Sequence, residues 1–153
     1  MRPRLLLAAA LGVALLAGCG GSSKLSKSAY RAKLAAISQD AQRAQNDVAK
    51  ALSASTVDEL HGRLTRFADA SDRLGDKIAG LKPPKDAEAA NAELARGEHD
   101  TAKEVRSAAT AIQKLKTPQA AINYLQKLGD LKGGRELDEA LKKLRQLGYA
   151  TGS

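Results

Sequence analysis

The side chain with the most distinctive chemistry in this sequence is Cys19, the only cysteine of the chain. A cysteine thiolate is a nucleophile that can accept a lipid group. Because no second cysteine is present, no disulfide can form within the chain, and the fold must be stable without one. Cys19 follows an apolar run from Leu5 to Ala17, which is shorter than the roughly 20 residues of a membrane-spanning helix. Such a run is typical of an export signal.

The segment around this cysteine resembles the lipobox of bacterial lipoproteins. Arg2 and Arg4 form a basic start, and the apolar run follows them. The box itself consists of Leu16, Ala17, Gly18 and Cys19. The resemblance implies that signal peptidase II cleaves before Cys19 and that the cysteine sulfur carries a diacylglyceryl group, whose two acyl chains anchor the protein stably. The alternatives are an ordinary secretory signal with a chance cysteine and a short membrane-inserted helix.

This resemblance divides the chain into four parts. Residues 1–18 are the expected signal peptide, and residues 19–27 are the lipidated cysteine with a flexible, Gly- and Ser-containing tether. Residues 28–149 are expected to form a helical bundle domain, and residues 150–153 a disordered tail. We therefore expect the mature protein to lie on the extracytoplasmic face of the cell membrane, held there by its lipid.

The two histidines, His61 and His99, are the next candidates for chemistry. Asp58 and His61 have the i, i+3 spacing that puts two side chains on one helix face, as in half of a metal site. A carboxylate-bridged site in a bundle would require a matching Glu-x-x-His, but Arg96 stands three residues before His99. The acidic neighbours of His99 fan around a helix and do not converge. We therefore expect two surface histidines, with no metal and no other cofactor.

No arrangement typical of an enzyme is found in the sequence. No serine is placed in a strand–turn–helix elbow, and Gly133-Gly134 lacks the following Gly-Lys-Ser/Thr of a phosphate-binding loop. Nucleic-acid binding is not expected either, because aromatic residues for base stacking make up only 3% of the chain. We expect a protein without catalytic activity.

Charge is distributed unevenly along the chain, whose formal net charge is +8. Gly20 to Ser55 contains six basic and two acidic residues, whereas Thr56 to Glu104 contains eight basic and eleven acidic residues. The basic part adjoins the expected anchor, where anionic headgroups attract each Lys or Arg by about 1 kcal/mol. The residues expected to contact the membrane surface are Lys24, Lys27, Arg31 and Lys33. The alternative is that they only solvate one face of a helix.

Apolar residues recur at alternating steps of three and four along the mature part, the pattern of amphipathic helices. The predicted helices span about residues 28–53, 56–81, 85–115, 118–128 and 135–147. Thr56 and Thr117 are the expected N-caps, and Gly148 is an expected C-cap. Because no segment alternates like a half-buried strand, the predicted fold is all-α. It is an antiparallel bundle of three longer helices plus two short C-terminal helices.

Two features are expected to interrupt the helical pattern. Gly97, Glu98 and Thr101 occupy the apolar stripe of the third helix, which predicts a kink or an exposed stretch there. Gly133-Gly134 predicts a chain break before the last helix.

The Ala-rich helices and the Lys-Gly-Gly-Arg-Glu-Leu segment at 132–137 resemble those of small, functionally uncharacterised actinobacterial lipoproteins. The leading hypothesis is a non-enzymatic surface lipoprotein that binds a protein or envelope partner through an incompletely covered apolar stripe. One alternative is a small metal-binding bundle that uses His61, His99 and nearby carboxylates. Another is a structural envelope component bound to anionic wall polymer or lipid.

Overall fold

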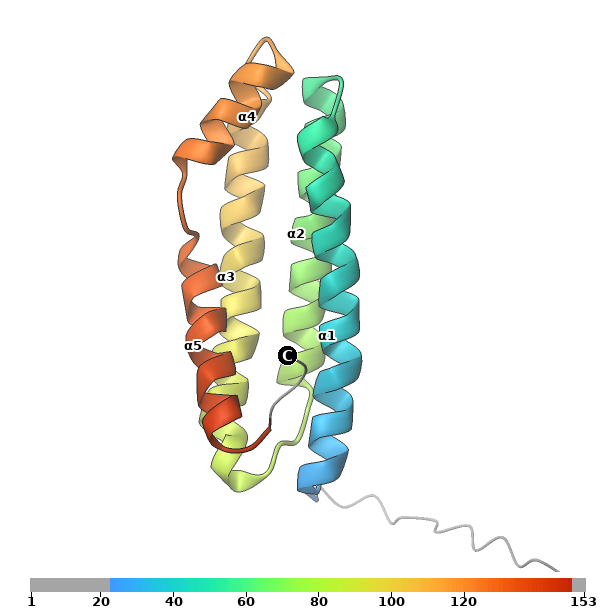
Figure 1. Ribbon diagram of the computed structural model, residues 1–153, viewed down its shortest axis with the longest axis vertical. Coiled ribbons are helices and arrows are strands. Elements are labelled where there is room, and N and C mark those ends of the chain that lie inside the picture. Colours follow the sequence, from blue (N-terminus) through green and yellow to red (C-terminus); the bar gives the residue numbers. More distant parts are fainter. Residues whose placement is uncertain (1–22, 150–153) are drawn as a thin grey trace, which may run out of the picture.

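The computed structural model describes residues 23–149, apart from the side chains of Asp47, Ala51 and Leu52. Its elements are α1 (Lys27–Ala49), η1 (Lys50–Ser53), α2 (Val57–Ala79), η2 (Lys85–Ala87), α3 (Glu88–Ile112), α4 (Pro118–Lys127) and α5 (Lys132–Gln146). The predicted all-α bundle of three longer and two shorter helices is confirmed (Figure 1). The predicted signal peptide, the lipobox with Cys19 and the tail at 150–153 lie outside the described residues.

The three long helices are antiparallel and run the length of the molecule (Figure 1). Helix α4 lies beside the upper end of α3, and α5 packs against the lower half of α3, so the two short helices together follow the path of a fourth helix. Helices α1 and α5 flank the central α2–α3 pair without packing closely against each other. None of the described helices combines the length and apolarity that crossing a membrane requires.

Side-chain caps fix the starts of α2 and α4, as the sequence predicts. The hydroxyl of Thr56 accepts a hydrogen bond from the Glu59 amide at 3.1 Å. The Glu59 carboxylate reaches back to the amide of Ser55 at 2.9 Å, one residue before the cap. The hydroxyl of Thr117 likewise accepts from the amide three residues later, and Pro118 occupies the first turn, where its missing N–H costs nothing.

The end of α5 is also formed as predicted. Gly148 has a φ of +76°, the left-handed conformation that glycine adopts without strain. The Tyr149 amide then donates to the carbonyl of Leu144 at 2.8 Å, which satisfies one of the free carbonyls at the helix end. This turn directs Tyr149 away from α5 and toward the start of α1.

The interior contains two apolar clusters separated by a polar layer. The lower cluster includes Tyr30, Leu34, Ile78, Leu94, Leu144 and Tyr149. The upper cluster includes Leu60, Leu64, Val105, Ile112 and Ala121. Between them, Ser71 of α2 and Thr101 of α3 are buried, with 1% and 6% of their surface exposed. The long helices therefore change from apolar to polar contact near their middle.

The predicted interruption of the third helix is wrong. Helix α3 continues through Gly97, Glu98 and Thr101, and both Gly97 and Thr101 are buried beneath α5. A methyl group on Gly97 would lie 2.9 Å from the side chain of Leu137. Only small residues fit in this stripe, because α5 approaches the α3 backbone closely.

The break predicted at Gly133-Gly134 is also wrong, because both glycines lie in the first turn of α5. The chain instead turns at Gly129, which has a φ of +64°. Gly133 contacts α3 so closely that a methyl group there would overlap the backbone nitrogen and hydroxyl of Thr101. The Glu104 carboxylate of α3 accepts from the amides of Lys132 and Gly133 at 3.2 and 3.1 Å. It thereby caps the positive end of α5 from the neighbouring helix.

These contacts predict opposite effects for two adjacent substitutions. Gly133→Ala should destabilise the protein by about 1 to 3 kcal/mol, because the added methyl forces α5 away from α3. Gly134→Ala, whose methyl would meet no atom within 4 Å, should be neutral or stabilising by up to about 1 kcal/mol. Urea denaturation followed by circular dichroism measures both. Equal effects of the two substitutions would show that α5 does not approach α3 as described.

Candidate functional site

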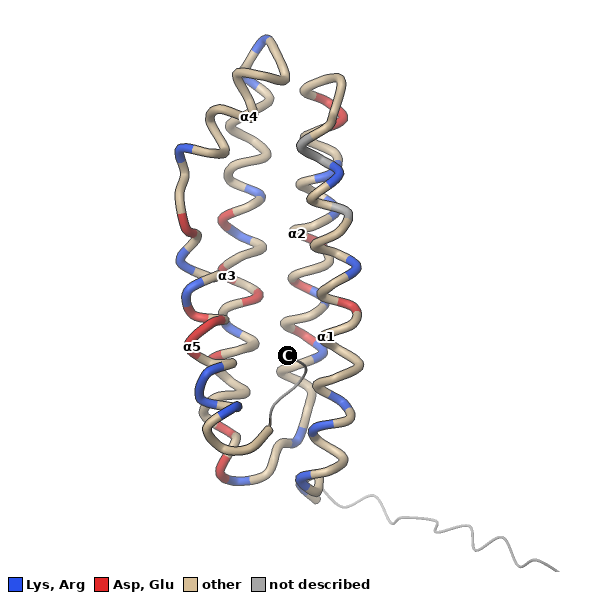
Figure 2. Tube along the Cα trace, viewed as in Figure 1, with Lys and Arg blue, Asp and Glu red and all other residues tan. Residues whose placement is uncertain are grey.

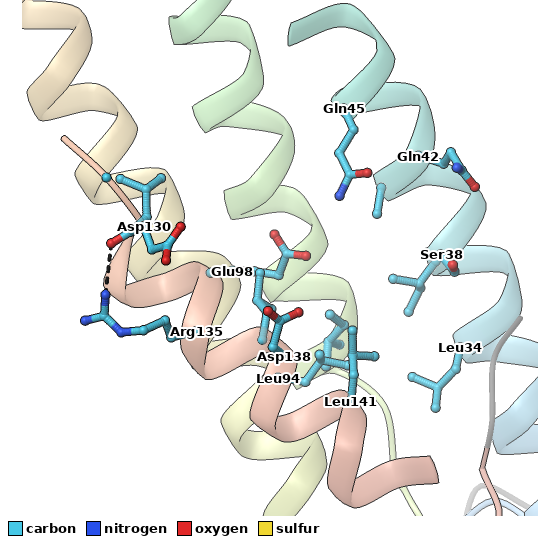
Figure 3. Close-up of a pocket in the computed structure, with 17 residues that line it drawn as sticks. Leu34, Ser38, Gln42, Gln45, Leu94, Glu98, Asp130, Arg135, Asp138 and Leu141 are labelled. Carbon is cyan, nitrogen blue, oxygen red and sulfur yellow. Dashed lines mark hydrogen bonds between the residues drawn. The ribbon is translucent and has the colours of Figure 1, made fainter. Parts of the chain in front are cut away.

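A groove of about 630 Å³ lies between α1 and α5 (Figure 3). This volume falls within the range of small-molecule sites. The walls are formed by α1 residues from Leu34 to Gln45 and by α5 residues up to Leu141. Ile78 of α2 and Leu94 and Glu98 of α3 form its floor. The groove exists because α1 packs mainly on α2 and α5 mainly on α3, so that α1 and α5 do not pack closely against each other along their length.

Below this groove, the turn that follows α5 contacts the start of α1. The ring of Tyr149 meets the ring of Tyr30 edge-to-face, with centroids 5.3 Å apart. The Tyr149 hydroxyl donates to Asp86 at 2.8 Å, and the Tyr30 hydroxyl donates to Asn91 at 3.0 Å. Burial, together with the nearby Tyr149, raises the pKa of Tyr30 to about 12, so both rings stay neutral and apolar. The lower ends of α1 and α5 are thus connected, and the groove opens above them.

Glu98 is an acid on the floor of the groove, and its pKa lies well above the ordinary value. Its carboxyl lies in the groove (Figure 3), and Glu98 stands three residues before Thr101 of the polar layer on α3. Burial raises the pKa of Glu98 to about 7, although a hydrogen bond with Ser71 and the nearby His99 act in the opposite direction. A carboxyl that is half ionised near neutral pH is typical of functional sites.

The other charged groups of the groove make it acidic. The carboxylates of Asp130 and Asp138 line it on the α5 side, together with Glu98 on the floor (Figure 3). Arg135 is the one basic lining residue, and its guanidinium donates to the backbone carbonyl of Asp130 at 2.9 Å. The described α1 side chains of the wall are uncharged, and the polar ones include the amide of Gln45. An acidic groove therefore stands in a chain whose net charge is positive.

His99 lies outside this groove, in a row of charged groups between α2 and α3. Its Nδ1 is 3.1 Å from Asp72, and its Nε2 is 3.6 Å from Asp76. Arg106 contacts the same Asp72 at 2.5 Å and Asp69 at 2.9 Å. Burial raises the pKa of Asp72, but the hydrogen bonds from His99 and Arg106 outweigh it and leave this pKa below its ordinary value.

The two histidines are not brought together. His61 lies eleven residues before Asp72 on α2, which corresponds to roughly 16 Å along the helix axis. No group of three or more His, Cys, Asp or Glu side chains that could hold a metal is present within residues 23–149. His99 instead packs over Gly75, where a methyl group would lie 2.8 Å from the imidazole. This histidine fills the space that the glycine leaves.

The four basic residues predicted to face the membrane differ in their contacts. Lys24 forms an ion pair with Glu88. Lys27 donates to the carbonyl of Leu147 at 2.8 Å, and its ammonium lies 4.8 Å from the centroid of the Tyr149 ring. Arg31 and Lys33 are exposed, and neither forms an ion pair within the described part of the chain. Two of the four thus contribute to the fold itself.

Comparison of the chain with models of protein families, with curated proteins and with solved structures finds no match. The site is therefore interpreted from its geometry alone. In the sequence, Glu98 is recognisable only as an interruption of the apolar stripe, and no pattern singles out Asp130 or Asp138. The available signal was the charged residue at an inward-facing helical position, since such residues are seldom buried without a reason.

The raised pKa of Glu98 predicts a specific pH dependence of stability. Between the ordinary value of 4.5 and about 7, the folded protein retains a proton that the unfolded chain loses. The free energy of unfolding should therefore decrease as the pH rises through this interval. Glu98→Gln should stabilise the protein above pH 7, on the order of 1 to 2 kcal/mol, and have little effect near pH 4.

Thermal or urea denaturation between pH 4 and 8 measures this difference. Glu139→Gln is the matched control, because Glu139 is an exposed acid on α5 outside the groove. The control should follow the wild-type profile. A Glu98→Gln profile parallel to that of the wild type would contradict the assignment.

Proposed function

We propose that this protein is a lipoprotein anchored through a diacylglyceryl group on Cys19 to the extracytoplasmic face of the cell membrane. Its helical domain serves there as a non-enzymatic binding protein. The anchor is supported by the order of basic start, apolar run and Leu-Ala-Gly-Cys box in the sequence. The binding role is supported by the groove between α1 and α5.

The groove carries this proposal because it combines a preformed hollow with a mixed lining. Side chains such as Leu34 and Leu141 offer apolar surface, while Glu98 and Asp138 offer charge at defined positions. An apolar hollow with a few convergent polar groups is the usual form of a ligand site. The bundle core alone does not require a carboxyl at position 98, where burial disfavours its ionised form.

The position of the groove is compatible with an anchor at the start of α1. The N-terminal end of α1, the loop between α2 and α3, and the C-terminal end of α5 lie at the same end of the molecule (Figure 1). Basic residues occur in all three segments (Figure 2). They include Lys24, Lys27, Lys82, Lys85, Lys142 and Arg145. With this end toward an anionic membrane, the groove would open to the side and stay accessible.

The anchor is tested by the substitution Cys19→Ser in the producing cell. Without the thiol, no lipid can be attached, so the variant should leave the membrane fraction or persist as the unprocessed precursor. Mass spectrometry of the wild-type N-terminus should find a lipid-modified Cys19. An unmodified N-terminus in the mature wild-type protein would refute the lipoprotein assignment.

The membrane-facing orientation is tested with vesicles of anionic and of neutral lipid. In the domain without its lipid, which would otherwise insert into either vesicle, the double variant Arg31→Gln/Lys33→Gln should weaken co-sedimentation with anionic vesicles at low salt, because each basic residue near the surface contributes about 1 kcal/mol. These two positions are chosen because they form no ion pair within residues 23–149, so the fold should be retained.

The matched control is Lys114→Gln/Lys116→Gln, which removes the same charge at the opposite end of the bundle. The control should bind anionic vesicles like the wild type. If both double variants lose binding equally, the attraction depends on net charge and the proposed orientation is wrong.

A further inference from the structure

We propose that the groove between α1 and α5 binds an aliphatic diamine or polyamine, whose ammonium groups contact the carboxylates of Glu98, Asp130 and Asp138. This inference rests on the proposed binding role and names the ligand class of the same site. Three features of the groove lead to it: its apolar lining, its charge and the spacing of its acids.

The groove has an apolar lining. Ile78, Leu94 and Leu34 lie beneath it and keep only 1%, 6% and 4% of their surface exposed. Ile37 of α1 and Leu141 of α5 also line the groove and are only partly buried, so they offer apolar surface to the methylene groups of an aliphatic chain. Burial of its methylene groups against these residues is favourable.

The charge of the groove selects a cation. Three carboxylates line it, and the guanidinium of Arg135 is directed to the backbone carbonyl of Asp130 (Figure 3). An anionic ligand would be repelled by the acids, and a neutral chain would gain no charge attraction from them. Protonated amines satisfy them through charge-assisted hydrogen bonds. The amide of Gln45 and the hydroxyl of Ser38 on α1 add neutral acceptors.

The spacing of the acids favours more than one amine. Asp130 precedes α5, and Asp138 follows it by eight residues, which corresponds to a separation on the order of 10 Å along the helix. Glu98 faces the same groove from α3. An eight-carbon diamine has a comparable length between its nitrogens, so both ends can meet a carboxylate while the methylenes stay on the apolar wall.

Binding should release a proton from Glu98 near neutral pH. The groups that act on this carboxyl are Ser71 on α2 and His99 on α3, and across the groove stand Asp130, Arg135 and Asp138. Among the described side chains of α1 that line the groove, none is ionisable. Because the free carboxyl has a pKa of about 7, an ammonium ion placed beside it favours the ionised form and expels the proton.

The test is isothermal titration of the mature lipidated protein in nanodiscs of neutral phosphatidylcholine, with empty nanodiscs as the blank. Three probes of equal length are used: octane-1,8-diamine, octane-1,8-diol and octanedioate. We expect only the diamine to bind. At pH 7 its apparent enthalpy should change with the ionisation enthalpy of the buffer, which reports the released proton.

Variants locate the site. Glu98→Gln and Asp138→Asn should each weaken diamine binding by about 10- to 100-fold, the effect of losing one hydrogen bond to a charged group. Glu98→Gln should also abolish the buffer dependence of the enthalpy. The control Glu139→Gln removes a neighbouring acid outside the groove and should change the affinity less than about twofold.

The outcomes separate this inference from the proposal on which it rests. Binding of the diol or the dioate in place of the diamine would retain the binding role and overturn the ligand class. Diamine binding weakened equally by Glu139→Gln would show attraction to surface charge and overturn the site. If none of the three probes binds, the inference fails and the groove loses its support as a binding site. If the lipid anchor is absent, the protein will not enter nanodiscs, which tests the anchor separately. The same titration is then made with the protein in solution.

Discussion

The close approach of α5 to α3 is the constraint on which the rest of the structure depends. Gly97 and Gly133 leave no room for a side chain between the two helices, and the Glu104 carboxylate caps the free amides of α5. Helix α5 packs mainly on α3 and α1 mainly on α2, so the two outer helices do not pack closely against each other. The Tyr30–Tyr149 contact connects α1 with the C-terminal turn only below the groove. The groove is therefore a consequence of how one short helix is docked.

The electrostatics of the bundle follow from the same arrangement. Helices α2 and α3 change from one apolar cluster to another at a polar layer, and Glu98 stands three residues before Thr101 of that layer and lines the groove. Burial makes ionisation of this carboxyl costly, whereas its place in the groove lining lets a cation reach it. A carboxyl in such a place weakens the fold at neutral pH. A cationic ligand that binds beside Glu98 favours the ionised form of this carboxyl and forms an ion pair with it.

Local signals in the sequence predict most of the fold, and the errors concern contacts between helices. Thr56, Thr117 and Gly148 act within one turn of chain, so their capping roles could be predicted from neighbouring residues. The roles of Gly97 and Gly133 depend on Leu137 and Thr101, which are 40 and 32 residues away in the sequence, and glycine also occurs at helix breaks. For the same reason the pairing of His99 with Asp72, and the joint position of Glu98 and Asp138, could not be predicted from spacing along one helix.

The most direct test of the account is a map of backbone amide shifts of the ¹⁵N-labelled protein during titration with octane-1,8-diamine. The account predicts that the largest shift changes occur on both walls and the floor of the groove, at residues such as Gln45, Glu98 and Asp138. Acids outside the groove, such as Asp58 and Glu93, should show little change. Shift changes of similar size at Asp58, Glu93 and the groove acids, or none at all, would contradict the claim that this groove is the binding site.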